Sequence, residues 1–362
     1  MNHWDAIVIG AGIIGLSLAI ELRKQGLRVL VVEKGEPGRE ASWAAGGMLS
    51  DCPLETSPGL QELATASAGM YPEFVGELES ESGLTIDLRS VGTLVFVDRR
   101  TEPGPGWAGP NSPTGQGYAL PGPLAELEPV LRTDDGSTAL YVPERCVDPR
   151  QLTAAALAAA RHRGVELSCG EGVLGVEVEN ERACGVRTRK TRFTADTVVN
   201  CAGAWAQQIA PSRPPTRPVK GQMLAIVMPE KEMVRHVVRT PDVYLIPRSD
   251  GRMVIGATAE EAGFDKQTVP ETIERLRRAA IDRVPSLADA RIQEAWAGLR
   301  PGTPDALPIL GPTTTRGYFV ATGHFRDGIL LAPVTAKIMA QIITGSAPEL
   351  DVTRFSAQRF SP

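Results

Sequence analysis

The sequence is poor in the residues that build metal centres and disulfide frameworks. Its 362 residues include five cysteines and four histidines. The cysteines are odd in number, lie far apart and form no Cys-x-x-Cys pair, so they indicate neither a redox dithiol nor a zinc knuckle. We therefore predict reduced, mostly structural thiols and no metal site.

Long apolar runs and clusters of basic residues are also lacking. The apolar stretch at residues 6–20 has no basic leader, is interrupted by glycines and is shorter than the roughly 20 residues of a membrane helix. The 38 lysines and arginines are scattered and the formal net charge is only −5, which does not favour a nucleic-acid partner. These properties predict a cytoplasmic protein that binds small molecules and has no membrane span.

The N-terminus does contain the pattern of a dinucleotide-binding unit. Residues 4–10 form a β-branched apolar run, typical of a parallel strand buried on both faces, which is expected to end at Gly10. Apolar residues at helical spacing follow as far as Gly26, a helix-terminating glycine. Residues 28–35 predict a second buried strand that ends in an acid, Glu33. Strand, glycine turn, helix, strand and acid thus occur in the order that this unit requires.

Each residue of the Gly-x-Gly-x-x-Gly pattern has a physical role in such a unit. Gly10 permits the tight turn, Gly12 lets the backbone approach a pyrophosphate, and Gly15 lets the helix pack closely on the strand. Glu33 is expected to hold the ribose hydroxyls, while the amides at the helix N-terminus face the phosphates. The alternative is that the glycines serve only the packing of strand against helix.

The glycine pattern fits both FAD and a nicotinamide cofactor, and the next segment favours FAD. Residues 34–50 are rich in small and hydroxyl side chains, which suits backbone lying close against a bulky flat group. Residues 195–210 and 317–345 repeat the order of strand, small-residue turn and helix. Three such units predict an α/β (mixed α+β) fold in which a Rossmann-like FAD-binding domain is assembled from discontinuous segments. The predicted division is 1–85, 145–215 and 300–362 for that domain, and 86–144 and 216–299 for a substrate-binding domain on a mostly antiparallel sheet.

Seven segments, in order along the chain, carry a resemblance to one flavoprotein group. They are GAGIIG with Glu33, ASWAAGGML, VVNCAGAW, PVKGQML, VYLIPRSDGRMVIGAT, WAGLRPGTPDALPILG and GHFRDGILLAP. Together they resemble the D-amino acid oxidase and sarcosine oxidase family, and the glycine oxidases within it. The resemblance implies oxidation of glycine, other small amino acids or N-alkyl glycines, in which FAD takes hydride from the α carbon and dioxygen becomes hydrogen peroxide. It also implies a supply of iminoacetate for the thiazole of thiamine, and a homo-oligomer, either a dimer or a tetramer.

Three residues are assigned to the substrate. Arg300 is the first choice for the substrate carboxylate, because a guanidinium offers a flat two-pronged donor that matches it. Tyr244 would direct its hydroxyl to the same carboxylate if strand alternation sends Tyr244 and Ile246 to one face and Leu245 to the other; otherwise it is a core tyrosine. Arg326 matches the family's second substrate-side arginine, and its alternative is an exposed loop charge.

The resemblance also implies a set of flavin contacts. Amides before the last helix are expected to face the pyrimidine edge of the flavin, where the helix dipole stabilises the negative charge of the reduced ring. Val173 would touch the adenine through its main chain, or else serve only core packing. No cysteine follows Cys201, so a covalent link in the C-terminal third is excluded and FAD is predicted to be noncovalent. The further contacts are Ile13, Ile14, Lys34, Ala41, Ser42, Gly46, Gly47, Met48, His324, Phe325, Arg326, Asp327, Gly328, Ile329 and Leu330.

The sequence departs from the glycine oxidase pattern at three places. Asp242 stands where a histidine is expected, and Ala259 stands where a methionine is expected. Sarcosine, N-ethylglycine or a small D-amino acid therefore compete with glycine as substrates. Residues 101–123 contain six prolines and six glycines, which predict a long surface loop in place of a helix.

Other functions remain open at this point. A dehydrogenase acting on D-amino acids or N-substituted amino acids would pass the electrons to an acceptor other than dioxygen. A nicotinamide-dependent reductase would normally need a second complete Gly-x-Gly-x-x-Gly, and the chain has only one. A non-catalytic FAD-binding protein would keep the nucleotide site without the chemistry, and the presence of all three substrate residues argues against it.

Overall fold

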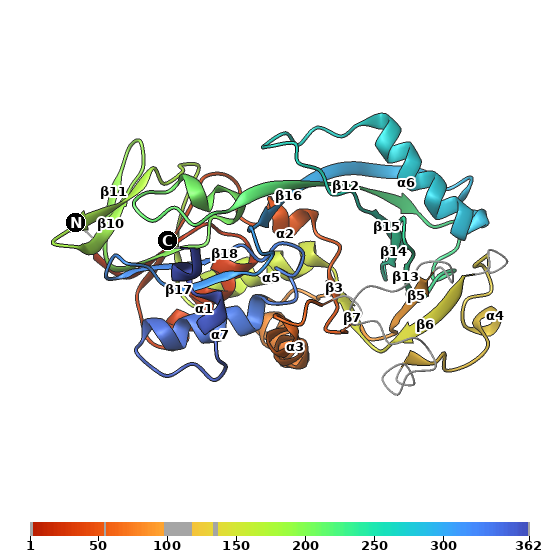
Figure 1. The fold of residues 1–362 in the computed structure, drawn as a ribbon, viewed down its shortest axis with the longest axis horizontal. Coiled ribbons are helices and arrows are strands. Elements are labelled where there is room, and N and C mark those ends of the chain that lie inside the picture. The colour runs from red at the N-terminus through yellow and green to blue at the C-terminus, as the bar shows by residue number, and fades with distance from the viewer. Residues whose placement is uncertain (1–2, 54–55, 98–117, 133–136, 361–362) are drawn as a thin grey trace.

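The computed structural model describes residues 3–53, 56–97, 118–132 and 137–360, and two large sheets organise them side by side (Figure 1). The first sheet has parallel strands at its centre, and β17 and the β9–β10 pair extend it with antiparallel pairing. Its central order is β17 (Ile309–Pro312), β18 (Tyr318–Thr322), β11 (Arg192–Asn200), β1 (His3–Ile9), β2 (Val29–Glu33) and β8 (Glu166–Cys169), with β10 (Arg182–Arg187) beside β11 and β9 (Gly175–Glu179) beside β10.

The central strands of this sheet are buried on both faces, which explains their continuous apolar runs. In β1, Ala6 and Val8 belong to the core formed with the helices, whereas Ile7 and Ile9 face a second core that includes β10 and β11. The helices on the first face are α1 (Ile13–Lys24), α3 (Gln61–Ser82), α5 (Pro149–His162) and α7 (Ala332–Ile343), gathered on one side of the sheet in Figure 1.

The second sheet is almost wholly antiparallel, and only the pairing of β13 with β5 is parallel. Strand alternation divides its side chains: Leu224 and Leu245 pack with helix α6 (Pro270–Arg283), while Met223 and Ile246 face the opposite side. Its order is β16 (Ile292–Gly302), β12 (Arg217–Val227), β15 (Arg252–Gly256), β14 (Tyr244–Pro247), β13 (Val237–Arg239), β5 (Thr93–Val97) and β6 (Thr138–Val142).

Smaller elements complete the described chain. A three-stranded sheet has the order β3, β7, β4, and the short helices lie in the connections and at the C-terminal end. Their bounds are β3 (Met48–Leu49), β7 (Arg145–Val147), β4 (Leu88–Arg89), α2 (Ala41–Ala44), α4 (Leu124–Leu127), η2 (Gly203–Gln208), η3 (Pro285–Leu287), η4 (Thr353–Phe355) and η5 (Ala357–Phe360).

The fold class is confirmed, with three local differences. The first strand ends at Ile9, one residue before the predicted Gly10. The helix predicted in the unit at residues 195–210 is a short 3-10 helix, η2. Strand β16 runs through the predicted domain boundary at residues 299–300, and the exact domain division stays a prediction.

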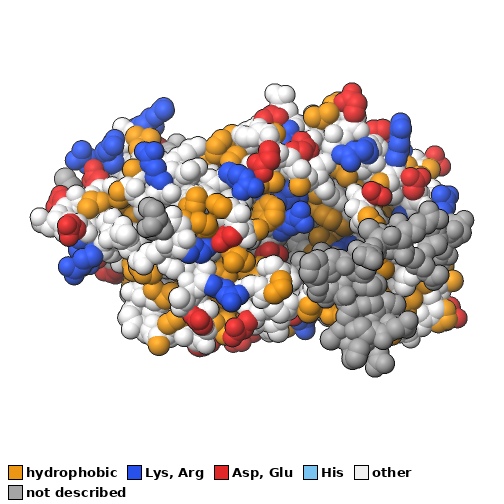
Figure 2. Space-filling model, viewed as in Figure 1, with side chains coloured by type: hydrophobic (Ala, Val, Ile, Leu, Met, Phe, Trp, Pro, Cys, Tyr) orange, Lys and Arg blue, Asp and Glu red, His pale blue; other side chains and the backbone are white. Residues whose placement is uncertain are grey.

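The surface shows charges of both signs mixed with small apolar groups over the face drawn in Figure 2. All five cysteines are free thiols. No helix within the described ranges is both long and apolar enough to cross a membrane. The predicted loop at 101–123 lies outside the described residues as far as residue 117.

Candidate functional site

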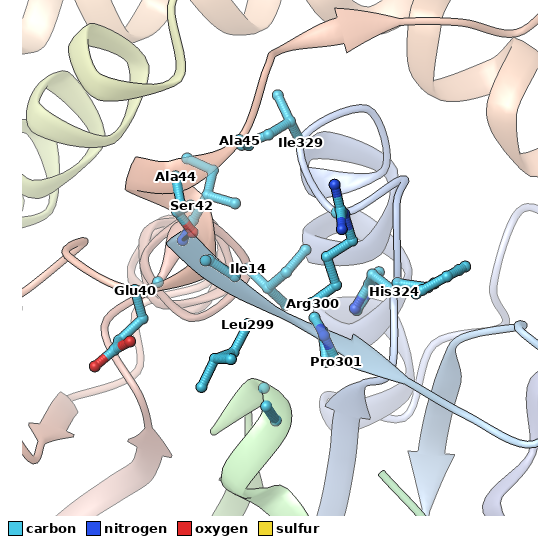
Figure 3. Close-up of a pocket in the computed structure, with 18 of the residues that line it drawn as sticks. Ile14, Glu40, Ser42, Ala44, Ala45, Leu299, Arg300, Pro301, His324 and Ile329 are labelled. Carbon is cyan, nitrogen blue, oxygen red and sulfur yellow. Dashed lines mark hydrogen bonds between the residues drawn. The ribbon is translucent and has the colours of Figure 1, made fainter. Parts of the chain in front are cut away.

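One cavity of about 1010 Å³ receives residues from both sheets (Figure 3). The first sheet contributes the ends of β1, β2 and β18 and the residues that follow β11, and the second contributes β12, β13, β14, β15 and β16. Ligand pockets in proteins range from about 300 to 1,000 Å³, so this volume suits a ligand of dinucleotide size with space beside it. Of the predicted site residues, only Gly15 and Leu330 do not line the cavity.

The glycine turn between β1 and α1 forms one end of this cavity. Gly10 has φ +103°, and a Cβ atom there would lie 2.7 Å from the carbonyl oxygen of Cys201. A Cβ atom on Gly15 would lie 2.0 Å from the carbonyl oxygen of Gly10, so the helix packs against the turn at this point. The role of Gly15 is therefore steric, while Gly10 and Gly12 present backbone to the cavity.

The amides at the start of α1 are shared between the protein and the cavity. The Ile13 amide donates to the Ser42 hydroxyl over 2.9 Å, which ties helix α1 to α2. The Ile14 amide has no acceptor among the residues that the structure describes, although Ile14 lines the cavity. The first amides of an α-helix lack intrahelical partners, and an anion satisfies them well.

Glu33 is buried and accepts hydrogen bonds from backbone amides, one of them in the glycine turn. Its Oε2 atom accepts the Ala11 amide at 2.8 Å, and its Oε1 atom accepts the Gly35 amide at 2.9 Å. A carboxylate has about four acceptor positions, so these two hydrogen bonds leave capacity for hydroxyl donors. The neighbouring Lys34 ammonium stacks on the Trp205 ring, 2.9 Å from its centroid, and pairs with Glu40 at 3.4 Å.

A turn before α7 presents further free amides to the cavity. Helix α3 fixes this turn, because the Tyr71 hydroxyl donates to the Ile329 carbonyl and the Ser67 hydroxyl donates to the Leu330 carbonyl at 2.6 Å. No acceptor within the described chain takes the amides of Gly328 and Ile329, and both residues line the cavity. Leu330 is itself buried in the core and contributes only through this anchoring.

His324 is a neutral residue at the edge of the same turn. Burial lowers its pKa to about 3. Its Nε2 atom lies 3.1 Å from the Thr335 hydroxyl on α7, within hydrogen-bond distance. Because the ring carries no charge near pH 7, His324 adds no positive charge to the cavity.

Arg300 and Tyr244 meet at the other end of the cavity, on strands β16 and β14. The Arg300 Nη1 atom donates to the Thr258 carbonyl over 2.9 Å, and Figure 3 shows the side chain rising from its strand into the pocket. Burial raises the pKa of Tyr244, and the adjacent Arg300 guanidinium opposes part of that shift. Tyr244 and Ile246 share one face of the sheet and Leu245 lies on the other, as the alternation predicts.

Arg326 lines the same cavity but is exposed in the turn before α7, so its alternative as an exposed loop charge stays open. Its guanidinium lies 5.2 Å from the centroid of the Phe325 ring and lowers the pKa of Tyr244, as Arg300 does. Neither Arg300 nor Arg326 forms an ion pair with a carboxylate of the described residues. The cavity therefore holds two guanidinium groups with free donors beside a protonated phenol.

Several lining residues have no clear signal in the sequence. Arg239 on β13 lines the cavity near Tyr244, but its guanidinium pairs with the buried Glu144 and lies 3.4 Å from the Ser50 hydroxyl. Trp205 lines the end near Lys34. Thr258 orients Arg300 through its backbone carbonyl, so its side-chain type gives no indication of this role.

The two departures from the glycine oxidase pattern both lie at this cavity. Asp242 and Ala259 line it. Val173 also lines the cavity and packs against the core that includes residues of β1 and β11, so adenine contact and core packing are compatible roles. No group of three histidine, cysteine or acidic side chains that could hold a metal ion occurs in the described parts of the chain.

A family model described as "FAD dependent oxidoreductase" matches residues 5–342 of this sequence. The chain belongs to the FAD-dependent oxidoreductase family. The glycine oxidase of Pseudomonas aeruginosa is 35% identical over 360 residues, which cover 95% of this chain and 96% of that protein. The crystal structure of glycine oxidase from Geobacillus kaustophilus superposes with a TM-score of 0.90, at 29% identity and full coverage of both chains.

Another relative of this FAD-dependent oxidoreductase is longer. The bifunctional protein ThiO/ThiG of Trichormus variabilis is 35% identical over 360 residues, covering 98% of this chain. The chain spans only 55% of that protein's length. The similarity therefore concerns one part of a two-part protein.

FAD is the cofactor of this family, and the residues present fit it. The glycine turn leaves room for backbone contact with a pyrophosphate, and Glu33 retains acceptor positions for ribose hydroxyls. The free amides of Ile14, Gly328 and Ile329 offer donors on two sides of the cavity. An FAD-dependent oxidoreductase needs these contacts, because the cofactor performs the redox step and the protein binds and orients it.

Proposed function

We propose that this protein oxidises glycine and other small amino acids or N-alkyl glycines at the α carbon. The observation that carries the proposal is the pair of guanidinium groups, Arg300 and Arg326, that line the cavity, lack carboxylate partners in the described chain and both act on the pKa of Tyr244. Arg300 is half-buried and Arg326 is exposed, and guanidinium groups with unpaired donors in a cavity select a carboxylate. The glycine oxidase names of the Pseudomonas and Geobacillus relatives support the choice of substrate class.

In the proposed reaction, the side chains bind the substrate and set its protonation state. Arg300 receives the carboxylate through the N–H groups that Thr258 does not take, and the raised pKa of Tyr244 keeps its hydroxyl as a donor to the same group. The positive charge of Arg300 and Arg326 disfavours a substrate ammonium, so the reactive neutral amine becomes more populated. FAD, when bound, accepts the hydride from the α carbon.

The backbone supplies the remaining contribution. The amides of Gly328 and Ile329 precede α7, and they would hold an electron-rich edge of the cofactor. The neutral His324 beside them adds no competing charge. No acid or base side chain is required for the hydride transfer itself.

Anaerobic mixing of the purified FAD-loaded protein with glycine, sarcosine and D-alanine tests the proposal. Loss of the oxidised flavin absorbance with at least one of them is the expected result, and the fastest reaction identifies the preferred substrate. An unchanged flavin spectrum with all three compounds would contradict the proposal and favour a non-catalytic FAD-binding protein.

The electron acceptor needs a separate measurement. We propose dioxygen, so the reduced protein should regain its oxidised spectrum in air and release hydrogen peroxide in proportion to substrate consumed. Slow reoxidation in air combined with fast reoxidation by a quinone would instead identify the dehydrogenase alternative.

Three further properties belong to this proposal. We propose that the product imine supplies thiamine thiazole formation, which the ThiO/ThiG relative supports. We propose noncovalent FAD, which acid precipitation tests by releasing the flavin into the supernatant. A homo-oligomer and a cytoplasmic location stay predictions, and light scattering of the purified protein tests the first of them.

A further inference from the structure

Two glycines lie on neighbouring strands beneath the substrate residues. Gly221 is in β12, and Gly256 ends β15, where it pairs with Met223 of β12 and with Tyr244 of β14. Neither glycine has a φ in the left-handed region, so φ does not require glycine at either position. Glycine weakens the interior of a strand, and a close approach by another group is a usual reason for its presence there.

At Gly221 the approaching group is the guanidinium of Arg300. A Cβ atom on Gly221 would lie 2.2 Å from Arg300 Nη1, 2.5 Å from Nη2 and 2.6 Å from Cζ. Val219, two residues earlier on β12, pairs with Arg300 in the ladder, so the side chain lies along the neighbouring strand over Gly221. The absence of a side chain at Gly221 therefore gives the guanidinium its place.

At Gly256 the approaching group is the ring of Tyr244. A Cβ atom there would lie 2.9 Å from both Tyr244 Cε2 and the hydroxyl oxygen, and 3.0 Å from Met223 Cγ. The Tyr244 hydroxyl lies 3.7 Å from the Sδ atom of Met223, the residue that pairs with Gly256 on its other neighbouring strand. The Tyr244 phenol and the Arg300 guanidinium thus both pack against the backbone of a glycine.

We propose that Gly221 and Gly256 are positioning residues that fix the carboxylate-binding geometry of Arg300 and Tyr244. This inference rests on the proposed function, since it assumes that these two side chains bind the substrate carboxylate. The clash at Gly221 involves the far end of a long flexible side chain. An alanine there displaces the guanidinium while the strand pairing persists.

The test is Gly221→Ala in the FAD-loaded protein. We expect the KM for glycine to rise about 10-fold or more, corresponding to loss of part of a charge-assisted interaction, while kcat changes by less than about 3-fold. The Kd for acetate, read from the perturbation of the flavin spectrum, should rise in parallel. Gly76→Ala is the matched control, because a Cβ atom at Gly76 in α3 meets nothing within 4 Å.

A double-mutant cycle separates positioning from a general structural effect. In an Arg300→Ala background, Gly221→Ala should change the acetate Kd by less than about 2-fold, because the displaced group is no longer present. Gly256→Ala provides the second variant, with an expected rise in the acetate Kd and retained FAD.

Two results would overturn the inference. One is acetate binding by Gly221→Ala and Gly256→Ala at the wild-type Kd. The other is loss of FAD, or a fall in Tm of more than about 4 °C, in both variants, since the glycines would then serve the fold. If the wild type does not oxidise glycine but binds acetate, the proposed function fails while the acetate measurements still decide this inference.

Discussion

The two ends of the cavity bind in different ways. The dinucleotide end is made mainly of backbone: the glycine turn at Gly10 and Gly12, the free amide of Ile14, and a carboxylate, Glu33, that holds the turn. The substrate end is made of side chains, above all Arg300 and Tyr244. Backbone shape follows from a short stretch of chain, whereas a side-chain cluster depends on which strands become neighbours.

The ends also differ in how their charges are balanced. Each Glu33 oxygen accepts one amide of its own turn and keeps acceptor capacity, and the Lys34 ammonium is paired with Glu40. Arg300 and Arg326 have no carboxylate partner among the described residues. Unpaired guanidinium groups are therefore available to a ligand near Tyr244, and changes at the two ends should have separable effects.

The largest expected effect is at the dinucleotide end, in Gly10→Ala. The substitution combines a φ of +103° with a Cβ position 2.7 Å from the Cys201 carbonyl oxygen, and backbone strain and overpacking each cost about 1–3 kcal/mol. We expect loss of bound FAD and a clear fall in Tm, measured by flavin absorbance after gel filtration and by thermal unfolding.

Gly26→Ala is the matched control for that variant. Gly26 also has a positive φ, +84°, but a Cβ atom there meets nothing within 4 Å. It should show only the strain, about 1 kcal/mol, and retain FAD. Equal losses in both variants would mean that contact with the Cys201 carbonyl is irrelevant.

Arg300→Ala should produce the complementary result at the substrate end. Removing one partner of a desolvated charge pair costs about 2–5 kcal/mol, so the KM for the amino acid or the Kd for acetate should rise at least about 30-fold. FAD content and Tm should stay near the wild-type values, because Arg300 pairs with no carboxylate of the described chain.

Arg278→Ala controls for the loss of an arginine, since Arg278 is an exposed residue on α6 that pairs with Glu274. It should leave substrate binding unchanged. If Arg300→Ala loses FAD together with substrate binding, the two ends are coupled and the comparison drawn above is wrong.

The smallest effect concerns His324, between the two ends. Its pKa is lowered to about 3 by burial, whereas an unfolded histidine titrates near 6.5. Between pH 6.5 and pH 3 this histidine is protonated in the unfolded state and neutral in the native state. The free energy of unfolding therefore decreases as the pH falls through this range. At pH 5 the loss is about 2 kcal/mol.

Urea unfolding of the FAD-loaded protein at pH 7 and pH 5 measures this contribution. The fall in unfolding free energy between the two values should be about 2 kcal/mol smaller in His324→Gln than in the wild type. His162→Gln, at an exposed position near the end of α5, should leave the pH dependence unchanged. An identical fall in all three proteins would show that His324 titrates in the native state as it does in the unfolded state.

Much of the first sheet was accessible to prediction because its signals are local. The strand β2, the helix α1 and the turn at Gly26 follow from residues within one 35-residue unit. The same reasoning predicted a helix after β11 without its type, and the chain forms the short 3-10 helix η2 there. Small residues permit several compact turns, so the choice between them rests on tertiary packing.

The substrate end was predicted in part, and chiefly through resemblance to a family. Arg300, Tyr244 and Arg326 do line one cavity. Arg239 was missed because its partner, Glu144, is distant in the sequence. Thr258 was missed because it orients Arg300 through its backbone carbonyl, which leaves no pattern of side chains in the sequence. The steric role of Gly221 was also hidden, since its neighbour Arg300 is 79 positions away in the numbering.

By itself, the sequence determined the local units: the apolar runs that become buried strands, the glycines that permit a tight turn, and the acid that ends β2. Only the tertiary structure decided which side chains lie over which strand, that Arg300 rests on Gly221, and which amides before α7 stay free. The physical reason is range. Backbone conformation depends on neighbours along the chain, whereas contacts and charge pairing depend on strand register and packing between distant segments.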